Sequence, residues 1–182
     1  MKTLISRVVF LLITSTGALL HAQSIKIPND KKLSSIAYSM VHPLHKWDGV
    51  SKDVSSIVVA DPERKNITQV AVSVKLNTFD SQNANRDSHM IEVAEGLKFP
   101  SVTFVSKEIK QDGDKLQVSG TLSFHGKSNE IAFQALRTNT DKQMVVAGGF
   151  KLKLTQFGIE PPSLLGLATE DEFELRFSMV YP

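Results

Sequence analysis

The chain has 182 residues, with 21 basic and 19 acidic side chains and no cysteine. This length suffices for one domain with a sizeable hydrophobic core. The lack of cysteine excludes disulfide bonds, thiolate metal sites, a cysteine nucleophile and an acylated lipoprotein cysteine.

Residues 1–22 have the layout of a secretory signal peptide. Lys2 and Arg7 precede an apolar run at residues 8–13, and a cleavage point follows at Ala22. A membrane anchor would need about 20 consecutive apolar residues, but small and polar residues interrupt this run at residues 14–17. We therefore expect a periplasmic or secreted protein with no stable membrane anchor, whose single domain spans residues 23–182.

Removal of this leader changes the charge balance. The leader contains two of the 21 basic residues and none of the 19 acidic ones, which leaves 19 of each sign. A nearly neutral chain lacks the basic patch that nucleic acids or anionic membrane surfaces require. We therefore expect no nucleic-acid partner.

Alternation of apolar and polar residues with a period of two predicts eight antiparallel strands, each with one buried face. Asp112-Gly113-Asp114 and His125-Gly126-Lys127-Ser128 lie at hairpin spacing between consecutive strands. In chain order, the predicted strands are residues 35–41, 54–60, 70–76, 101–110, 116–124, 129–136, 144–154 and 173–181.

The segment between Asn83 and Gly96 breaks this alternation, because its apolar residues recur at helical spacing. Asn83 is a suitable N-cap, and Gly96 can end the helix. On such a helix Arg86 and His89 share a face, since residues three and four apart are neighbours. The sequence thus predicts one short helix between two strands.

Eight strands with single apolar faces either close into a barrel or stack as two sheets. A closed eight-stranded barrel has room for side chains or one small ligand. We favour the barrel because several inward positions carry bulky side chains, while Gly120 and Gly148 leave space. A filled β-sandwich acting as an interaction module is the alternative. The predicted interior includes Phe104, Phe124, Phe133, Phe150 and Phe177.

Five motifs follow one another along the chain. They are Tyr38-Ser39-Met40-Val41-His42 with a later glycine turn at Trp47-Asp48-Gly49, Arg86-Asp87-Ser88-His89-Met90, Phe99-Pro100-Ser101-Val102-Thr103-Phe104, Val118-Ser119-Gly120-Thr121-Leu122-Ser123-Phe124-His125-Gly126, and Phe157-Gly158-Ile159. In this order the motifs resemble those of the YceI-like family of exported lipid-binding proteins. The resemblance implies a lipocalin-like antiparallel barrel that holds a long isoprenoid or other lipid-like chain.

Two departures from the family pattern concern the ligand's polar end. Leu154-Thr155-Gln156 stands where the family often has an arginine, which removes one headgroup contact. His42-Pro43-Leu44-His45 adds a second histidine.

We expect His42, His45, Arg86 and His89 to form a polar mouth that meets a phosphate, carboxylate or quinone head. An arginine offers a planar fork suited to phosphate. The competing interpretation is that Arg86 and Asp87 only tie the helix to its neighbouring strands. The apolar part of the ligand would contact Phe104, Phe124, Phe133, Phe150 and Phe177.

Three further interpretations follow from what the chain has and lacks. His42, His45 and His89 would form a three-histidine metal site, structural or catalytic, if the fold brought them together. The chain has no nucleophile elbow, phosphate loop or His-Glu-x-x-His motif, so we expect neither catalysis nor a cofactor. A homodimer is compatible with the sequence, which does not determine the oligomeric state.

Overall fold

The structure is a computed structural model that describes residues 24–182. The predicted signal peptide lies outside the described residues and stays a prediction. Within residues 24–182, none of the helices has the length and apolar character needed to cross a membrane.

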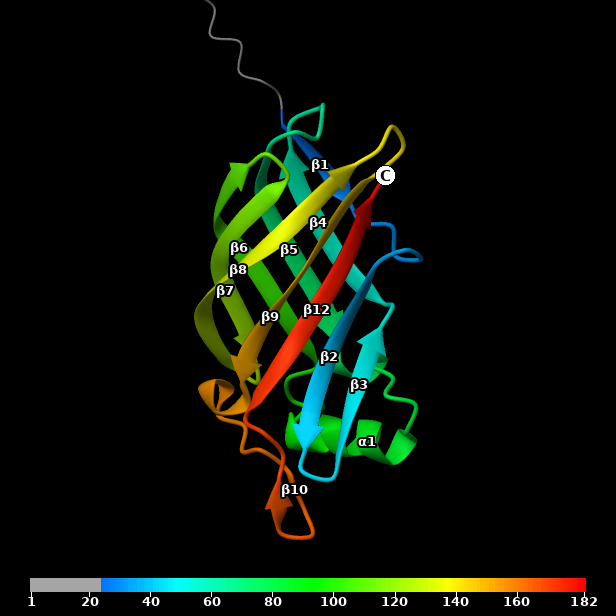
Figure 1. Ribbon diagram of the computed structural model, residues 1–182, viewed down its shortest axis with the longest axis vertical. Coiled ribbons are helices and arrows are strands. Elements are labelled where there is room, and N and C mark those ends of the chain that lie inside the picture. The colour runs from blue at the N-terminus through cyan, green and yellow to red at the C-terminus, as the bar shows by residue number, and fades with distance from the viewer. Residues whose placement is uncertain (1–23) are drawn as a thin grey trace, which may run out of the picture.

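A ten-stranded antiparallel sheet curls around an apolar interior (Figure 1). Its strand order is β1-β4-β5-β6-β7-β8-β9-β12-β2-β3, so β12 lies between β9 and β2. A separate pair, β10 (Ser163–Leu164) and β11 (Leu167–Ala168), forms a small hairpin. The ten strands of the main sheet are β1 (Ile25–Pro28), β2 (Ser35–His42), β3 (His45–Ser51), β4 (Val54–Ala60), β5 (Ile67–Lys75), β6 (Ser101–Asp112), β7 (Lys115–Phe124), β8 (Lys127–Asn139), β9 (Met144–Lys153) and β12 (Glu172–Tyr181).

In the described part of the chain, the edge strands β1 and β3 do not pair with each other. Other hydrogen bonds join the first strands to β12. The Tyr181 hydroxyl on β12 lies 2.7 Å from Ser56 Oγ on β4. Asp30, just after β1, donates its N–H to the Val180 carbonyl at 2.7 Å. The sheet is therefore a strongly curled, incompletely closed barrel.

The predicted fold class is confirmed as an all-β, lipocalin-like curled sheet with one short α-helix. The predicted number of strands is wrong, because the alternation of the sequence does not predict β1 and β3. β1 has only four residues and ends in Pro28. β3 contains Trp47 and Gly49, which were expected in a turn. Gly49 is needed inside the strand because a Cβ there would overlap the ring of Tyr38 on β2.

The short helix α1 (Ala84–Val93) forms where the sequence predicts it. The Asn83 side chain accepts a hydrogen bond from the Arg86 N–H at 3.1 Å, which caps the helix start. Two 3₁₀ turns, η1 (Leu76–Thr78) and η2 (Leu154–Phe157), lie before α1 and after β9. Figure 1 shows α1 across one end of the curled sheet, beside the β2–β3 turn and the β10–β11 hairpin.

The opposite end of the sheet contains a buried arginine that sequence reasoning missed. Arg137 on β8 is only 7% exposed. Its guanidinium donates hydrogen bonds to the carbonyl oxygens of Lys65 and Gly113, the latter at 3.0 Å, and lies 3.3 Å from Asp114 Oδ1. These bonds join the β4–β5 loop and the β6–β7 turn to β8. Polar groups therefore cover that end of the sheet.

Candidate functional site

The interior of the curled sheet contains an apolar cavity with two adjoining lobes. Their volumes are about 90 Å³ and about 150 Å³. By comparison, one water needs roughly 10–15 Å³ of such space and two to four polar partners. The lining is almost entirely non-polar, so a water molecule there would find few hydrogen-bond partners. The residues that both lobes share are Ile36, Val74, Val102, Leu122 and Leu175.

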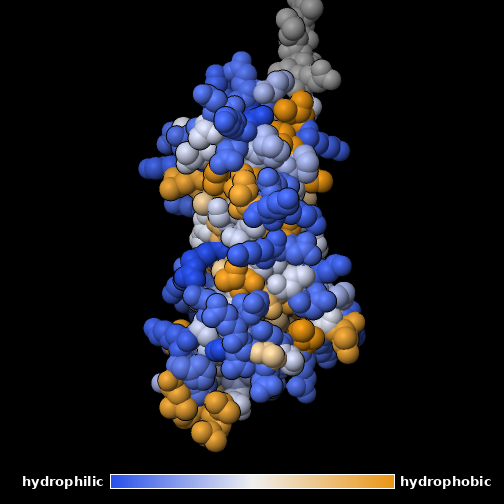
Figure 2. All heavy atoms as spheres, turned by 90° about the vertical axis from the view of Figure 1, so that its right-hand side faces the viewer, coloured by the Kyte–Doolittle hydropathy of each residue, from blue (hydrophilic) through white to orange (hydrophobic). Residues whose placement is uncertain are grey.

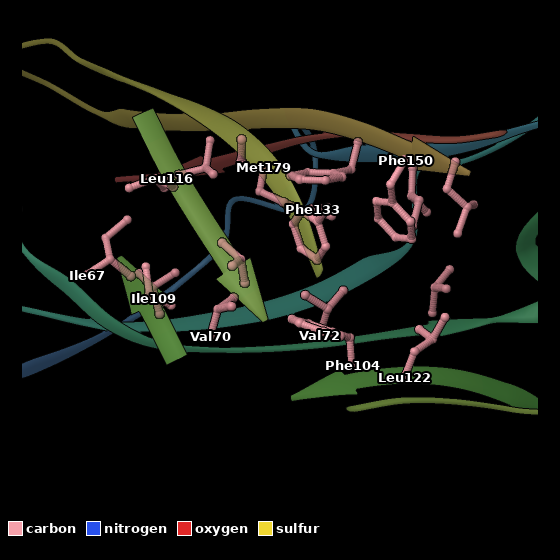
Figure 3. A pocket seen from close by; sticks show the side chains of 18 of the residues that line it. Ile67, Val70, Val72, Phe104, Ile109, Leu116, Leu122, Phe133, Phe150 and Met179 are labelled. Carbon is pink, nitrogen blue, oxygen red and sulfur yellow. The ribbon is translucent and has the colours of Figure 1, made fainter. Parts of the chain in front are cut away.

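The smaller lobe, called the inner lobe here, contains a group of four phenylalanines. Figure 3 labels three of them, Phe104, Phe133 and Phe150. Phe133 stacks on Phe150, with ring centroids 4.7 Å apart, and lies 5.4 Å from Phe104 and 5.7 Å from Phe177. Phe133, Phe150 and Phe177 are only half-buried although they line the interior. The cavity leaves part of each ring without packing partners, and an apolar ligand would cover it.

Two glycines make room for these rings. A Cβ at Gly120 would lie 2.8 Å from Phe104 Cζ, and a Cβ at Gly148 would lie 3.0 Å from Phe177 Cζ. Both distances are below ordinary van der Waals contact. The atoms closest to a Cβ at Gly120 or Gly148 are the carbonyl oxygens of Val105 and Gln134, so close strand packing as well as the aromatic group requires glycine at these positions.

The larger lobe lies under α1 and is called the helix lobe here. The helix contributes Met90 and Val93, its C-cap contributes Ala94, and Phe124 also lines the lobe. The lobe also has the cavity's main polar side chains. They are Tyr38 on β2, Trp47 on β3, and Arg86 and His89 on α1.

Arg86 is held in place from two sides. Its Cζ lies 5.1 Å from the centroid of the Trp47 ring, which is cation–π geometry. Its Nε donates to Ser81 Oγ at 3.0 Å, and the neighbouring Asp87 carboxylate accepts from the Ser81 N–H at 3.1 Å. Among residues 24–182, the hydrogen bond of the Arg86 side chain is made by Nε, which leaves Nη1 and Nη2 available to a ligand.

Tyr38 and Trp47 are polar groups of the helix lobe that sequence reasoning missed. The Tyr38 hydroxyl and Trp47 Nε1 are buried, and within residues 24–182 neither has a hydrogen-bond partner other than the other group. Burial raises the pKa of Tyr38, whereas the Trp47 N–H and the Arg86 charge oppose that rise. Burial, the Trp47 N–H and the Arg86 charge therefore all affect the ionisation of the Tyr38 hydroxyl. In the sequence Tyr38 belongs to a strand motif and Trp47 to a predicted turn, so the pattern assigns neither residue to the ligand site.

Neither lobe is lined by His42 or His45, and the predicted part of these histidines in a polar mouth stays a prediction. The Leu44 N–H donates to His42 Nδ1 at 3.2 Å, which assigns the ring proton to Nε2. Nε2 then donates to the Leu167 carbonyl at 3.0 Å. Both nitrogens of His42 are thus used to tie the β2–β3 turn to the β10–β11 hairpin, and His45 is exposed beside it.

His89 lines the helix lobe, but its side chain is 57% exposed, and Nδ1 lies 3.4 Å from Glu92 Oε2. It therefore lies where the lobe meets solvent. Arg86 and His89 share the lobe, as their predicted common helix face implies. Their part in ligand binding stays a prediction, as does that of the five phenylalanines, all of which line the cavity.

The three-histidine metal site is not formed. Within the described range, no group of three or more histidine, aspartate or glutamate side chains is placed to hold a metal ion. The rings of His42 and His45 are 5.2 Å apart, but both nitrogens of His42 already have partners. His89 lies on a different element, α1, where its Nδ1 lies 3.4 Å from Glu92 Oε2. The structure therefore gives no support to the alternative based on His42, His45 and His89.

The β10–β11 hairpin presents an apolar surface at the same end as α1. Leu164, Leu165 and Leu167 are 51%, 84% and 42% exposed. Figure 2 shows apolar side chains gathered at this end of an otherwise mostly hydrophilic face. Only the base of this segment reaches the helix lobe, through Pro162 and Ile159.

Comparisons with known proteins agree in family and fold. The sequence profile of the YceI-like domain matches residues 29–181. Protein YceI of Salmonella newport is 28% identical over 187 residues, covering 98% of this chain and 96% of the relative, and Protein YceI of Salmonella dublin gives the same values.

Solved structures with the same fold have lower sequence identity. BcnA of Burkholderia cenocepacia aligns with a TM-score of 0.75 and 19% identity, covering 84% of this chain and 98% of that one. A polyisoprenoid-binding domain from Saccharophagus degradans, implicated in plant cell wall breakdown, aligns with a TM-score of 0.70 and 15% identity, covering 85% and 96%. At these identities the likeness establishes the fold.

Proposed function

The chain belongs to the YceI-like family, and we propose that it binds one long isoprenoid or other lipid-like molecule inside its curled sheet. The observation that carries this proposal is the dry, two-lobed cavity under α1. The polyisoprenoid-binding domain of the same fold supports the choice of ligand class. Binding sequesters or carries the ligand and leaves it chemically unchanged.

The energetics of the cavity suit a long, unreactive chain. Each buried methylene contributes about 0.8 kcal/mol, so a chain of several isoprene units gains affinity without specific polar contacts. The stacked Phe133 and Phe150 rings limit the width of the inner lobe. The cavity therefore selects ligands by the width and length of their chain. The polar groups of the helix lobe favour one end of the ligand over the other.

We also propose a periplasmic or secreted location, supported by the charged, apolar and small-residue pattern of residues 1–22. This location brings the protein to the surfaces of membranes, where long apolar molecules are stored. A homodimer stays an untested prediction.

Purification of the exported protein tests the proposal directly. A native mass spectrum, followed by solvent extraction and measurement of metal content, identifies what the protein carries. We expect one co-purified apolar lipid per chain, with metal below stoichiometric amounts. A protein that carries no lipid and binds no added long-chain ligand would contradict the proposal.

A further inference from the structure

An exposed group of leucines, called the apolar tip here, lies at the end of the molecule where α1 covers the helix lobe. It consists of Leu164, Leu165 and Leu167 on the β10–β11 hairpin and Leu44 in the β2–β3 turn. We propose that the apolar tip inserts into the surface of a lipid bilayer without net charge and brings the helix lobe to that surface. The choice of a bilayer as partner rests on the proposed function, since long isoprenoid chains reside in membranes.

The first argument is exposure. Leu44 is 61% exposed, and the three leucines of the hairpin are exposed to a similar or greater degree. The hairpin extends beyond α1 and the end of the curled sheet (Figure 1), and apolar side chains gather there (Figure 2). Neighbouring apolar side chains that remain exposed together mark a site of interaction.

The second argument is the conformation of the hairpin turn. Leu165 and Gly166 are its two central residues, and both have a positive φ, of 53° and 77°. Such turns favour Asn-Gly or Asp-Gly, because a larger side chain is strained in this region of φ. Leu165 is 84% exposed, so packing within the described residues offsets little of this strain. Insertion of the side chain into lipid would provide the missing apolar contacts.

The third argument is that hydrogen bonds hold the apolar tip in its protruding position. The Glu170 N–H donates to the Val41 carbonyl at 2.8 Å, which ties the base of the hairpin to β2. His42 donates from Nε2 to the Leu167 carbonyl at 3.0 Å and accepts from the Leu44 N–H at 3.2 Å. The two turns are thus presented together, and little order remains to be gained on docking.

The fourth argument distinguishes a bilayer from other partners. Residues 163–168 have no charged side chain, and exposed charges of both signs flank the tip at Glu160, Glu170 and Lys46. These charges do not favour an anionic surface, which attracts clusters of basic residues. A stable protein interface buries about 800 Å² on each partner, and four partly exposed leucines on a protruding tip supply only a fraction of that area. Insertion of a few apolar groups into lipid gives weak, reversible binding, which suits a carrier.

The experiment measures flotation of the purified exported protein with phosphatidylcholine vesicles. We expect binding at about millimolar lipid that added salt does not weaken, because salt screens charges only. Leu165→Asn removes the apolar side chain and introduces a residue that the turn favours. It should weaken vesicle binding about tenfold and leave the melting temperature unchanged or raise it. A purely structural role for Leu165 would instead lower the melting temperature.

Leu136→Asn is the matched control. Leu136 on β8 is 59% exposed and pairs with Lys115 beside the β6–β7 turn, at the end opposite α1. It should leave vesicle binding unchanged. Displacement of an apolar fluorophore by hexadecane, without vesicles, measures the cavity separately and should be equal in the wild type and Leu165→Asn.

The outcomes separate docking from the proposed function. If hexadecane displaces the fluorophore but the wild type does not float, or both variants lose vesicle binding equally, the docking tip alone is wrong. Binding to anionic vesicles only would overturn the uncharged bilayer as partner. A dimer that Leu165→Asn dissociates, without vesicle binding, would assign the tip to a second copy and overturn the proposal. Loss of both vesicle and hexadecane binding in the wild type would contradict docking and the proposed function together.

Discussion

The ring of Tyr38 lies against the backbone of Gly49 on the neighbouring strand, so closely that a side chain at Gly49 would overlap it. This contact places the phenol in the lobe under α1, where its hydroxyl is buried beside the Trp47 N–H. The missing side chain at Gly49 on β3 thus allows the Tyr38 phenol to lie in the lobe with Trp47 and Arg86.

Gly49→Ala is expected to destabilise the protein by about 1–3 kcal/mol, the usual range for overpacking a core. The added methyl group must displace the Tyr38 ring or bend β3. Chemical denaturation of the single and double variants with Tyr38→Ala measures the coupling between the two sites. Removal of the ring should abolish most of the effect of Gly49→Ala. Additive changes in unfolding free energy would show that the contact does not limit this position.

Filling the inner lobe should block ligand binding without unfolding the protein. Val70 on β5 lines that lobe and is half-buried. Val70→Phe places a ring into existing space, so we expect at least a tenfold loss of affinity for long-chain ligands and little change in stability. Val105→Phe is the control, since Val105 on β6 is 56% exposed and lies outside the lining. Equal affinity losses in both variants would place the ligand elsewhere.

Phe133 should set the length of chain that the cavity accepts. It contacts Phe104, Phe150 and Phe177 at the centre of the aromatic group. Phe133→Ala should reduce stability by about 3 kcal/mol, the low end for such substitutions because the ring is only half-buried. It should also shift the preferred ligand to a longer chain, as measured with a series of alkanols.

Phe99→Ala is the comparison for this effect, because Phe99 packs against His125 outside the cavity lining. It should lower stability without altering the preferred chain length. A preference that moves equally in both variants would point to general loosening of the fold.

Much of the fold could be predicted because local patterns determine it. On β5, Val70, Val72 and Val74 alternate and all line the cavity, as the period of two requires. α1 begins at the predicted cap, and its helical spacing brings Arg86 and His89 to the same lobe. Such features depend on neighbours a few residues apart, which the sequence displays directly.

β3 could not be predicted from the sequence, because contacts with distant residues determine which side chains occupy its inward positions. Gly49 accommodates the ring of Tyr38, and Ser51 is fully buried with its Oγ 2.7 Å from Thr78 Oγ1. A glycine and a serine at inward positions conceal the apolar alternation that indicates a strand.

The contacts of His42 could not be predicted for the same reason. Its strand position puts it on the face of Tyr38 and Met40, which line the helix lobe. Its ring instead bonds the Leu167 carbonyl, 125 residues further along the chain. Periodicity predicts which face of a strand a side chain occupies, but not which distant segment covers it.

Tyr181 should make the stability of the protein depend on pH in the alkaline range. Burial raises its pKa to about 12, with the Ser56 hydrogen bond opposing that rise, whereas an unfolded tyrosine has a pKa of about 10. Both states are protonated below pH 10, so the folded state keeps its full stability there. Above pH 10 the unfolded chain loses the proton first, and stability falls until the folded group also ionises. Two pKa units correspond to a loss of roughly 2–3 kcal/mol. Unfolding free energies of the wild type minus those of Tyr181→Phe, measured from pH 9 to 12, should show this decline, whereas a constant difference would mean that the phenol ionises equally in both states.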